Sequence, residues 1–106
     1  EGYLVTKQIF AKHPQVKLLF AANDMMALGA LKYLEENKRA EVKVAAYDAL
    51  DEAVAEVEAG RLAVTVNQQA AEQGFQGVTL AVRLLKDERV PQITLIDTRL
   101  ITAKPK

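Results

Sequence analysis

Polar side chains follow three apolar segments of this chain, and their types suit hydrogen bonding to a small polar ligand. The apolar run 18–22 ends in Asn23 and Asp24. Two further apolar segments end in the same way, at Asp48 and at Gln68. An ionised aspartate accepts charge-assisted hydrogen bonds, and an amide side chain offers both a donor and an acceptor. These positions are therefore the first candidates for a binding site.

The apolar segments are expected to be buried parallel strands that place their polar ends along one edge of a sheet. Continuous hydrophobic runs are typical of parallel strands, because helices cover the faces of such sheets. Ligands of open α/β sheets bind just outside the carboxyl ends of the strands. We predict strands over 16–22, 42–47 and 62–66, and a last strand, at an edge, over 94–102.

Helical periodicity separates these strands. Apolar residues that recur every three or four positions predict helices over 3–12, 25–36, 51–59 and 71–87. The order α-β-α-β-α-β-α-β predicts an α/β fold with a Rossmann-like (flavodoxin-like), mainly parallel sheet and helices on both faces. Because a right-handed βαβ unit needs a strand before its helix, a chain that opens on a helix at Glu1 is expected to be cut from something longer.

Composition excludes several kinds of function. The chain has 106 residues, with 14 Lys and Arg against 14 Asp and Glu, so no net field attracts nucleic acid. It has no cysteine, which excludes disulfides and thiolate metal sites. His13 is the lone histidine and has no partner base or nucleophile in the sequence pattern. We expect a binding function without a catalytic residue, a cofactor or a metal.

Helix capping offers a second role for the polar pair at the first strand end. Asn and Asp both accept hydrogen bonds from the free amides of a helix N-terminus. We assign the cap of the helix that begins at Met25 to Asp24, and a ligand contact to Asn23. Gly29, inside the same helix, predicts a close approach of a neighbouring element, for which packing on the sheet is the plain interpretation.

The other two strand ends differ in the alternatives they leave open. Asp51 is predicted to cap the helix 51–59, which leaves Asp48 available to a ligand. Asn67 and Gln68 could instead be ordinary turn residues, and the residue types alone do not decide between these roles.

Three segments of the chain resemble the C-terminal portion of type 1 periplasmic sugar-binding proteins of the ribose-binding kind. They are 20–31, which contains Asn-Asp-x-x-Ala-x-Gly-Ala-Leu, then 44–48, and then 59–68 with Gly74. Their order and spacing agree with that family over nearly the whole chain. The effector-binding core of LacI-type repressors is nearly as similar.

The resemblance implies one lobe of a two-lobed clamp that closes on a sugar and performs no chemistry. It implies that Asn23, Asp48 and Gln68 are sugar contacts, and that Tyr47 is the aromatic residue that covers the C–H face of the sugar ring. The implied ligand is a monosaccharide, either a pentose or a hexose. The implied partners are a missing N-terminal lobe and the membrane subunits of an ABC-type transporter, in the periplasm.

The same resemblance implies that the chain contains two parts, one that forms the lobe and one that reaches the other lobe. Residues 1–69 and 93–106 are expected to form the lobe, whereas 70–92 would carry a helix that packs on the other lobe in the family. Within this chain alone the apolar stripe of helix 71–87 lacks that partner. We therefore expect it to fold back on its own sheet or to pack against a second chain, as a homodimer.

Three other functions remain alternatives. The chain could be the effector-sensing core of a cytoplasmic LacI-type regulator, although the segment 97–106 matches the Arg-x-Ser/Thr ending of such cores poorly. A phosphoacceptor domain of the response-regulator type would need an acid cluster that holds Mg²⁺ and a strand-end lysine. The third strand ends in Asn67 and Gln68 and offers no such lysine. A structural unit without a ligand is the remaining possibility.

Overall fold

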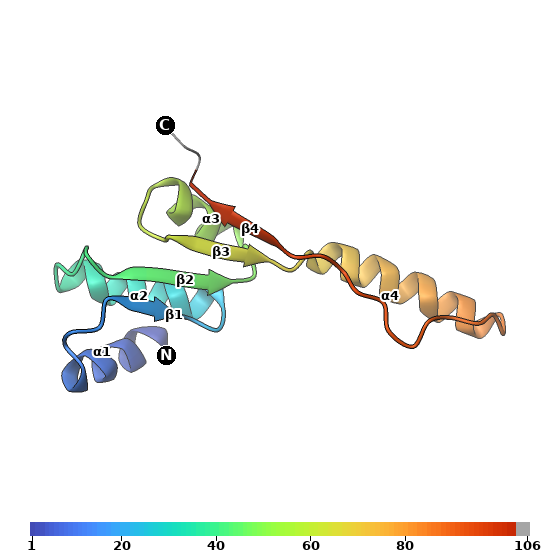
Figure 1. The fold of residues 1–106 in the computed structure, drawn as a ribbon, viewed down its shortest axis with the longest axis horizontal. Helices are drawn as coiled ribbons and strands as arrows, with labels where there is room; N and C mark the ends of the chain where they lie inside the picture. The colour runs from blue at the N-terminus through green and yellow to red at the C-terminus, as the bar shows by residue number, and fades with distance from the viewer. Residues whose placement is uncertain (104–106) are drawn as a thin grey trace.

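A computed structural model, which describes residues 1–103, has the predicted alternation of helices and strands (Figure 1). The final residues of the predicted lobe segment, 104–106, lie outside this range. The helices are α1 (Gly2–Lys12), α2 (Asp24–Glu36), α3 (Asp51–Glu58) and α4 (Ala70–Leu85). The strands are β1 (Leu18–Phe20), β2 (Lys43–Tyr47), β3 (Val64–Asn67) and β4 (Arg99–Thr102).

The four strands form one mainly parallel sheet in the order β1-β2-β3-β4. β1, β2 and β3 pair in parallel, with Leu19 opposite Val44 and Ala46 opposite Thr65. β4 runs antiparallel to β3 and lies at the edge of the sheet, so its predicted edge position is confirmed. It is shorter than predicted, because residues 94–98 form no strand and instead cross from α4 towards the sheet.

In residues 1–103 the helices cover one face of this sheet and leave the other bare, which corrects the expectation of helices on both faces (Figure 1). Val44 and Ala46 of β2 and Thr65 of β3 are buried against α2 and α3. Because β1, β2 and β3 follow one another across the sheet in chain order, right-handed crossovers bring α2 and α3 to the same side. The core forms on that side, with these buried residues: Phe10, Ala27, Leu34, Val42, Val44, Ala46, Ala53, Val57 and Leu62.

Within the described part of the chain, no helix lies on the opposite face of the sheet, which carries apolar side chains. Leu18 and Phe20 of β1 and Leu100 of β4 are exposed there. The strand register places Ala45 and Val64 between them, because neighbours in a strand point to alternate faces. We call this surface, formed by Leu18, Phe20, Lys43, Ala45, Tyr47, Val64, Val66, Leu100 and Thr102, the open sheet face.

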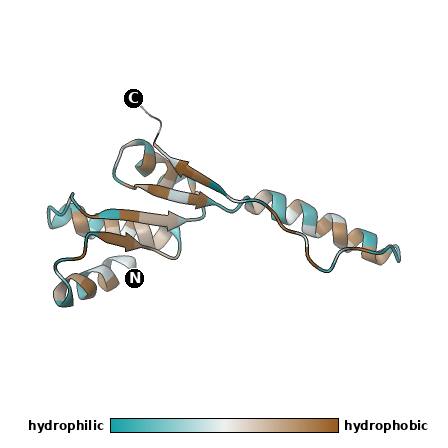
Figure 2. Ribbon diagram, viewed as in Figure 1, coloured by the Kyte–Doolittle hydropathy of each residue, from teal (hydrophilic) through white to brown (hydrophobic). Residues whose placement is uncertain are grey.

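Helix α4 projects away from the sheet and does not fold back on it (Figure 1). None of its 16 residues is buried, although apolar residues line it (Figure 2). The return segment 91–96 lies against it, beside Gln73, Gln76 and Leu80. The radius of gyration is 18.0 Å, against about 13 Å for a compact chain of this length. The expectation that α4 folds back on its own sheet is therefore wrong.

Two glycines let α1 and α2 touch backbone to backbone. A Cβ atom at Gly29 of α2 would lie 2.7 Å from the backbone nitrogen of Tyr3 in α1. A Cβ atom at Gly2 would lie 2.2 Å from the carbonyl oxygen of Met26. The close approach predicted at Gly29 is confirmed, but the element that approaches is helix α1 and not the sheet.

This contact predicts opposite effects for two Gly→Ala substitutions. Gly29→Ala should lower the free energy of unfolding by about 1–3 kcal/mol, because the new methyl group meets backbone that cannot move aside. Gly74→Ala, in α4, should raise helicity and stability by up to about 1 kcal/mol, since a Cβ atom there would meet no other element within 4 Å. Urea unfolding followed by circular dichroism measures both. A Gly29→Ala protein as stable as the parent would contradict the close packing of α1 on α2.

Candidate functional site

The candidate site lies in the loops that follow β1, β2 and β3. These strands are parallel neighbours, so Asn23, Asp48 and Gln68 lie together at the carboxyl ends of the strands. Gln68 Nε2 donates a hydrogen bond of 2.8 Å to Asp48 Oδ1. The structure therefore brings two of the sequence-predicted residues into direct contact, and both side chains are only partly buried.

Asn23, not Asp24, caps helix α2. Its Oδ1 accepts a hydrogen bond of 2.9 Å from the backbone nitrogen of Met26, and its extended backbone is typical of an N-cap. The sequence-based assignment of the cap to Asp24 is thus wrong. The cap uses the oxygen of the Asn23 amide, and its Nδ2 takes part in no hydrogen bond with residues 1–103. A ligand contact through that nitrogen stays a prediction.

Asp24 is fully buried and links the start of α2 to strand β3 and to the loop after β2. Its Oδ1 accepts a hydrogen bond of 2.6 Å from the Thr65 hydroxyl, and its Oδ2 accepts one of 2.7 Å from the backbone nitrogen of Leu50. Asp24 is also the first residue of α2, where the helix dipole favours a negative charge. Sequence reasoning missed this role because it depends on Thr65, which is 41 positions away.

The loop after β2 has an unusual backbone that three hydrogen bonds hold in place. Asp48 and Ala49 have φ angles of 130° and 60°, a region that residues other than glycine rarely adopt. The amide of Asp48 donates to the carbonyl oxygen of Val66 at 2.9 Å, and that of Ala49 donates to Thr65 Oγ1 at 3.1 Å. The amide of Leu50 donates to Asp24. Strain of this kind persists only where the surroundings fix it, and it concentrates at ligand sites.

Of two further predictions near this loop, the helix cap at Asp51 is wrong and the ligand contact of Tyr47 stays a prediction. Asp51 makes no capping hydrogen bond, because it is the first residue inside α3 and Leu50 occupies the N-cap position. The capping assignment of Asp51 is therefore wrong, and Asp48 is held by Gln68 instead of being unpaired. Tyr47 alternates with the buried Ala46 in β2, so its ring belongs to the open sheet face, next to Asp48 in sequence.

The chain leaves the site for α4 through a fixed turn. Asn67 Oδ1 accepts a hydrogen bond of 2.8 Å from the backbone nitrogen of Gln69, which supports the turn-residue role for Asn67. Gln69 has a φ angle of 55°, and its Nε2 donates to the carbonyl oxygen of Asp97 at 2.6 Å. This last bond ties the outgoing segment to the returning one. No sequence pattern pointed to Gln69, because its partner is distant in the chain.

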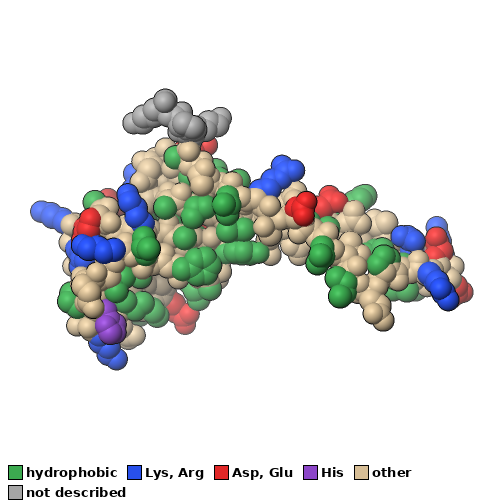
Figure 3. Space-filling model, in the orientation of Figure 1, with side chains coloured by type: hydrophobic (Ala, Val, Ile, Leu, Met, Phe, Trp, Pro, Cys, Tyr) green, Lys and Arg blue, Asp and Glu red, His purple; other side chains and the backbone are tan. Residues whose placement is uncertain are grey.

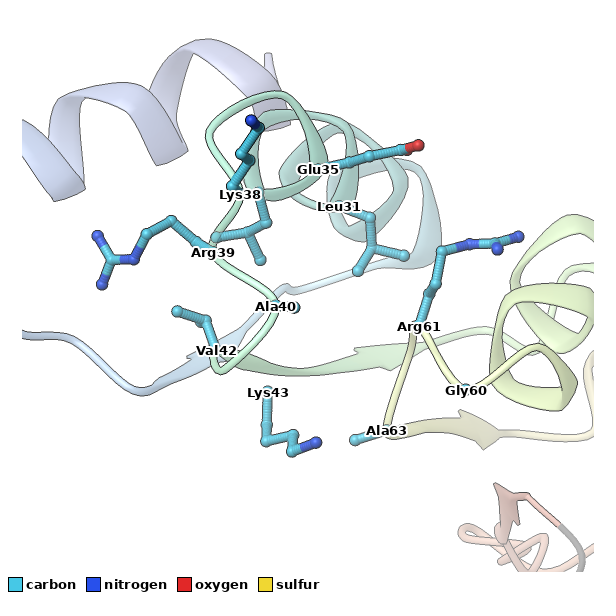
Figure 4. Close-up of a pocket in the computed structure, with 11 residues that line it drawn as sticks. Leu31, Glu35, Lys38, Arg39, Ala40, Val42, Lys43, Gly60, Arg61 and Ala63 are labelled. Atoms are coloured by element: carbon cyan, nitrogen blue, oxygen red, sulfur yellow. The ribbon is translucent and has the colours of Figure 1, made fainter.

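A cavity of about 410 Å³ lies at the other end of the sheet and is not part of this site (Figure 4). Its walls come from the end of α2 and from the loops before β2 and β3. The charged ends of Arg39 and Arg61 point outward from it (Figure 4). Arg39 donates to Glu41 and to the carbonyl oxygen of Pro14, and Arg61 pairs with Glu56. Both guanidinium groups are therefore already occupied.

Ionisable groups with shifted pKa values lie away from the site. The pKa of Glu41 is lowered by the hydrogen bond from Arg39, and the pKa of Tyr3 is raised by its hydrogen bond to Glu36. Both hydrogen bonds are exposed to solvent. Residues 1–103 contain no group of three His, Asp or Glu side chains that could hold a metal ion. No helix among them is long and apolar enough to span a membrane.

The fold and the strand-end polar groups define one lobe of a binding-protein architecture, and comparisons with known proteins give its family. Residues 1–89 match the family described as periplasmic binding protein domain. The chain belongs to this family.

Individual relatives agree with this family assignment. The ribose import binding protein RbsB of Salmonella typhimurium is 36% identical over 101 residues, which cover 95% of this chain and 34% of that protein. The D-allose-binding periplasmic protein of Escherichia coli is 30% identical over 92% of this chain and is matched over 34% of its own length. A solute-binding protein of Actinobacillus succinogenes with bound D-allose superposes with a TM-score of 0.90 at 27% identity, over 95% of this chain and 36% of that one. The chain thus spans about a third of the length of these relatives.

The buried hydrogen bonds of Thr65 to Asp24 and Ala49 should contribute to the stability of the fold. Thr65→Val preserves the shape of the side chain but removes the hydroxyl that joins Asp24 to Ala49. It leaves a buried carboxylate oxygen and a buried amide without their partner, so the free energy of unfolding should fall by about 2–4 kcal/mol. Urea unfolding measures the loss.

Asp51→Ala provides the matched control, because this exposed carboxylate makes no capping bond. It should change stability by no more than about 0.5 kcal/mol. A Thr65→Val loss as small as that of the control would show that the network does not hold the loops together.

Proposed function

We propose that this chain is the C-terminal sugar-recognising part of a solute-binding protein for an ABC-type sugar importer. The observation that carries the proposal is the Asp48–Gln68 pair at the carboxyl ends of adjacent parallel strands. The relatives named above are import or solute-binding proteins, and no transcriptional regulator is among them. They therefore favour the transport function over the alternative of a LacI-type effector core.

The chemistry of the strand-end residues supports a monosaccharide ligand. Asp48 Oδ1 accepts from Gln68, which fixes the carboxylate and leaves Oδ2 for ligand hydroxyls. The amide oxygen of Gln68 and the Nδ2 group of Asn23 add an acceptor and a donor. Tyr47 supplies an aromatic surface for the C–H face of a sugar ring. Such a set of donors and acceptors matches vicinal hydroxyls, and it has no nucleophile or general base pair, so we propose binding without catalysis.

The remaining contacts to the sugar would come from a second lobe. The relatives are about three times as long as this chain, and small ligands are normally buried over most of their surface. The site on this chain has loops on one side only. We propose that residues 1–69 and 93–103 form one lobe, that 70–92 extends to the other, and that the complete protein acts in the periplasm beside its membrane subunits.

Nuclear magnetic resonance tests this proposal on the chain itself. Adding D-ribose or D-allose to about 100 mM should shift amide signals in the loops at 22–24, 47–50 and 67–69, with millimolar or weaker affinity because half of the contacts are missing. Asp48→Ala should remove these shifts while the rest of the spectrum is kept. Sugar-independent spectra in all three loops would contradict the proposal.

Calorimetry on a chain joined to a second lobe tests the roles of individual residues. Asp48→Ala and Gln68→Ala should each weaken sugar affinity roughly 10- to 100-fold, as expected for a charge-assisted hydrogen bond that is lost. Asp51→Ala, an exposed carboxylate three positions further along, should leave the affinity unchanged. Equal effects of Asp48→Ala and Asp51→Ala would exclude a recognition role for Asp48.

A further inference from the structure

Two buried polar side chains, Asp24 and Thr65, hold the loops of the candidate site without being open to a ligand. Both are 0% exposed. Thr65 faces the side of the sheet that α2 and α3 cover, away from the open sheet face, over which Figure 3 shows hydrophobic side chains. A ligand on the surface of the loops therefore has no contact with either side chain.

The hydroxyl of Thr65 joins the loop after β2 to strand β3. It donates its hydrogen to Asp24 Oδ1 at 2.6 Å and accepts from the amide of Ala49 at 3.1 Å. A hydroxyl has one hydrogen to donate and two lone pairs to accept with, so one group can serve both partners. Because β3 ends at Asn67, next to Gln68, the bond to Ala49 fixes the loop after β2 relative to the strand end that carries Gln68.

The carboxylate of Asp24 joins the loop after β1 to the loop after β2. Its Oδ2 accepts a hydrogen bond of 2.7 Å from the amide of Leu50, two residues after Asp48. Asp24 directly follows Asn23, the N-cap of α2. The bond to Leu50 therefore fixes Asn23 relative to Asp48, as the bond of Thr65 fixes Asp48 relative to the end of β3.

The backbone of the loop after β2 needs this support. Asp48 and Ala49 have φ angles of 130° and 60°, which are costly for residues other than glycine and persist only where the surroundings fix them. A backbone carbonyl holds the amide of Asp48, but the amides of Ala49 and Leu50 are held by side chains, those of Thr65 and Asp24. Without these two acceptors the loop is free to adopt commoner backbone angles, which turn the Asp48 carboxylate away from its present direction.

We propose that Asp24 and Thr65 are positioning residues for sugar recognition, which act through the loop after β2 and never touch the sugar. The inference rests on the proposed function, because it takes Asn23, Asp48 and Gln68 as the ligand contacts. A preformed site avoids the cost of ordering its loops when the ligand binds. If the loop held its present conformation for only about a tenth of the time, the apparent dissociation constant would rise about 10-fold.

A pair of substitutions at Thr65 separates the hydroxyl from the rest of the side chain. In the complete two-lobed protein, Thr65→Val should weaken the affinity for D-ribose or D-allose about 10-fold, because the loop loses its acceptor for Ala49. Thr65→Ser keeps the hydroxyl and should retain the parent affinity. Calorimetry measures both, and an equal loss in the two variants would overturn the proposal.

Leu34→Ala is the control for a general loss of stability. Leu34 lies in the hydrophobic core towards the end of α2 that is away from the site. Removing most of a buried leucine side chain destabilises a fold without disturbing a distant hydrogen bond. At a temperature where circular dichroism shows all variants folded, Leu34→Ala should keep the parent affinity. A loss as large as that of Thr65→Val would show that affinity merely follows stability and would overturn the positioning role.

Amide hydrogen exchange on the chain without sugar tests the positioning role independently of the proposed function. In Thr65→Val the amides of Ala49 and Leu50 should exchange faster relative to those within α2, whereas in Thr65→Ser and Leu34→Ala this ratio should stay as in the parent. Asp24→Asn, whose amide has one acceptor oxygen instead of two, should also raise it. Unchanged loop exchange in both Thr65→Val and Asp24→Asn would overturn the positioning role, whereas a parent that binds no sugar would contradict the proposed function.

Discussion

The buried carboxylate of Asp24 is the interaction on which the arrangement of the site depends. Its two oxygens accept hydrogen bonds from Thr65 in β3 and from the backbone of Leu50 before α3. A buried carboxylate is costly unless both oxygens are satisfied, and no buried side-chain polar atom within residues 1–103 lacks a partner. This one side chain therefore connects the starts of two helices to the strand between the candidate ligand residues. The same network helps to hold the strained loop at Asp48, through Thr65 to the amide of Ala49 and through Asp24 to the amide of Leu50.

The one-sided layering of the sheet has an equally simple origin. Strands that follow one another in chain order across a sheet place their connecting helices on a single face. α2 and α3 form the core there, and the other face keeps Leu18, Phe20 and Leu100 exposed. The candidate recognition loops lie at the carboxyl ends of the strands, so the same sheet carries polar groups at its strand ends and exposed apolar side chains on one face. Tyr47 belongs to both surfaces, because its ring lies on the open sheet face while it precedes Asp48 in the chain.

Sequence patterns predicted the elements well and the local hydrogen bonds less well. The alternation of helices and strands, the parallel sheet and the edge position of the last strand were all confirmed. Both capping assignments were wrong, because Asn23 takes the role given to Asp24 and Asp51 caps nothing. Capping residues have the same types as ligand residues, and a pair such as Asn23 and Asp24 differs only in which side chain points inward. That direction depends on contacts with Thr65 and Leu50.

The sequence by itself determined the fold class and the positions that carry polar groups at strand ends, because apolar periodicity and strand polarity are local properties. The tertiary structure decided what those groups do. It joined Asp48 to Gln68, buried Asp24 and placed helix α1 against Gly29. It also left one side of α4 and one face of the sheet uncovered within residues 1–103. Each of these outcomes depends on residues that are far apart in the chain, so no local pattern contains them.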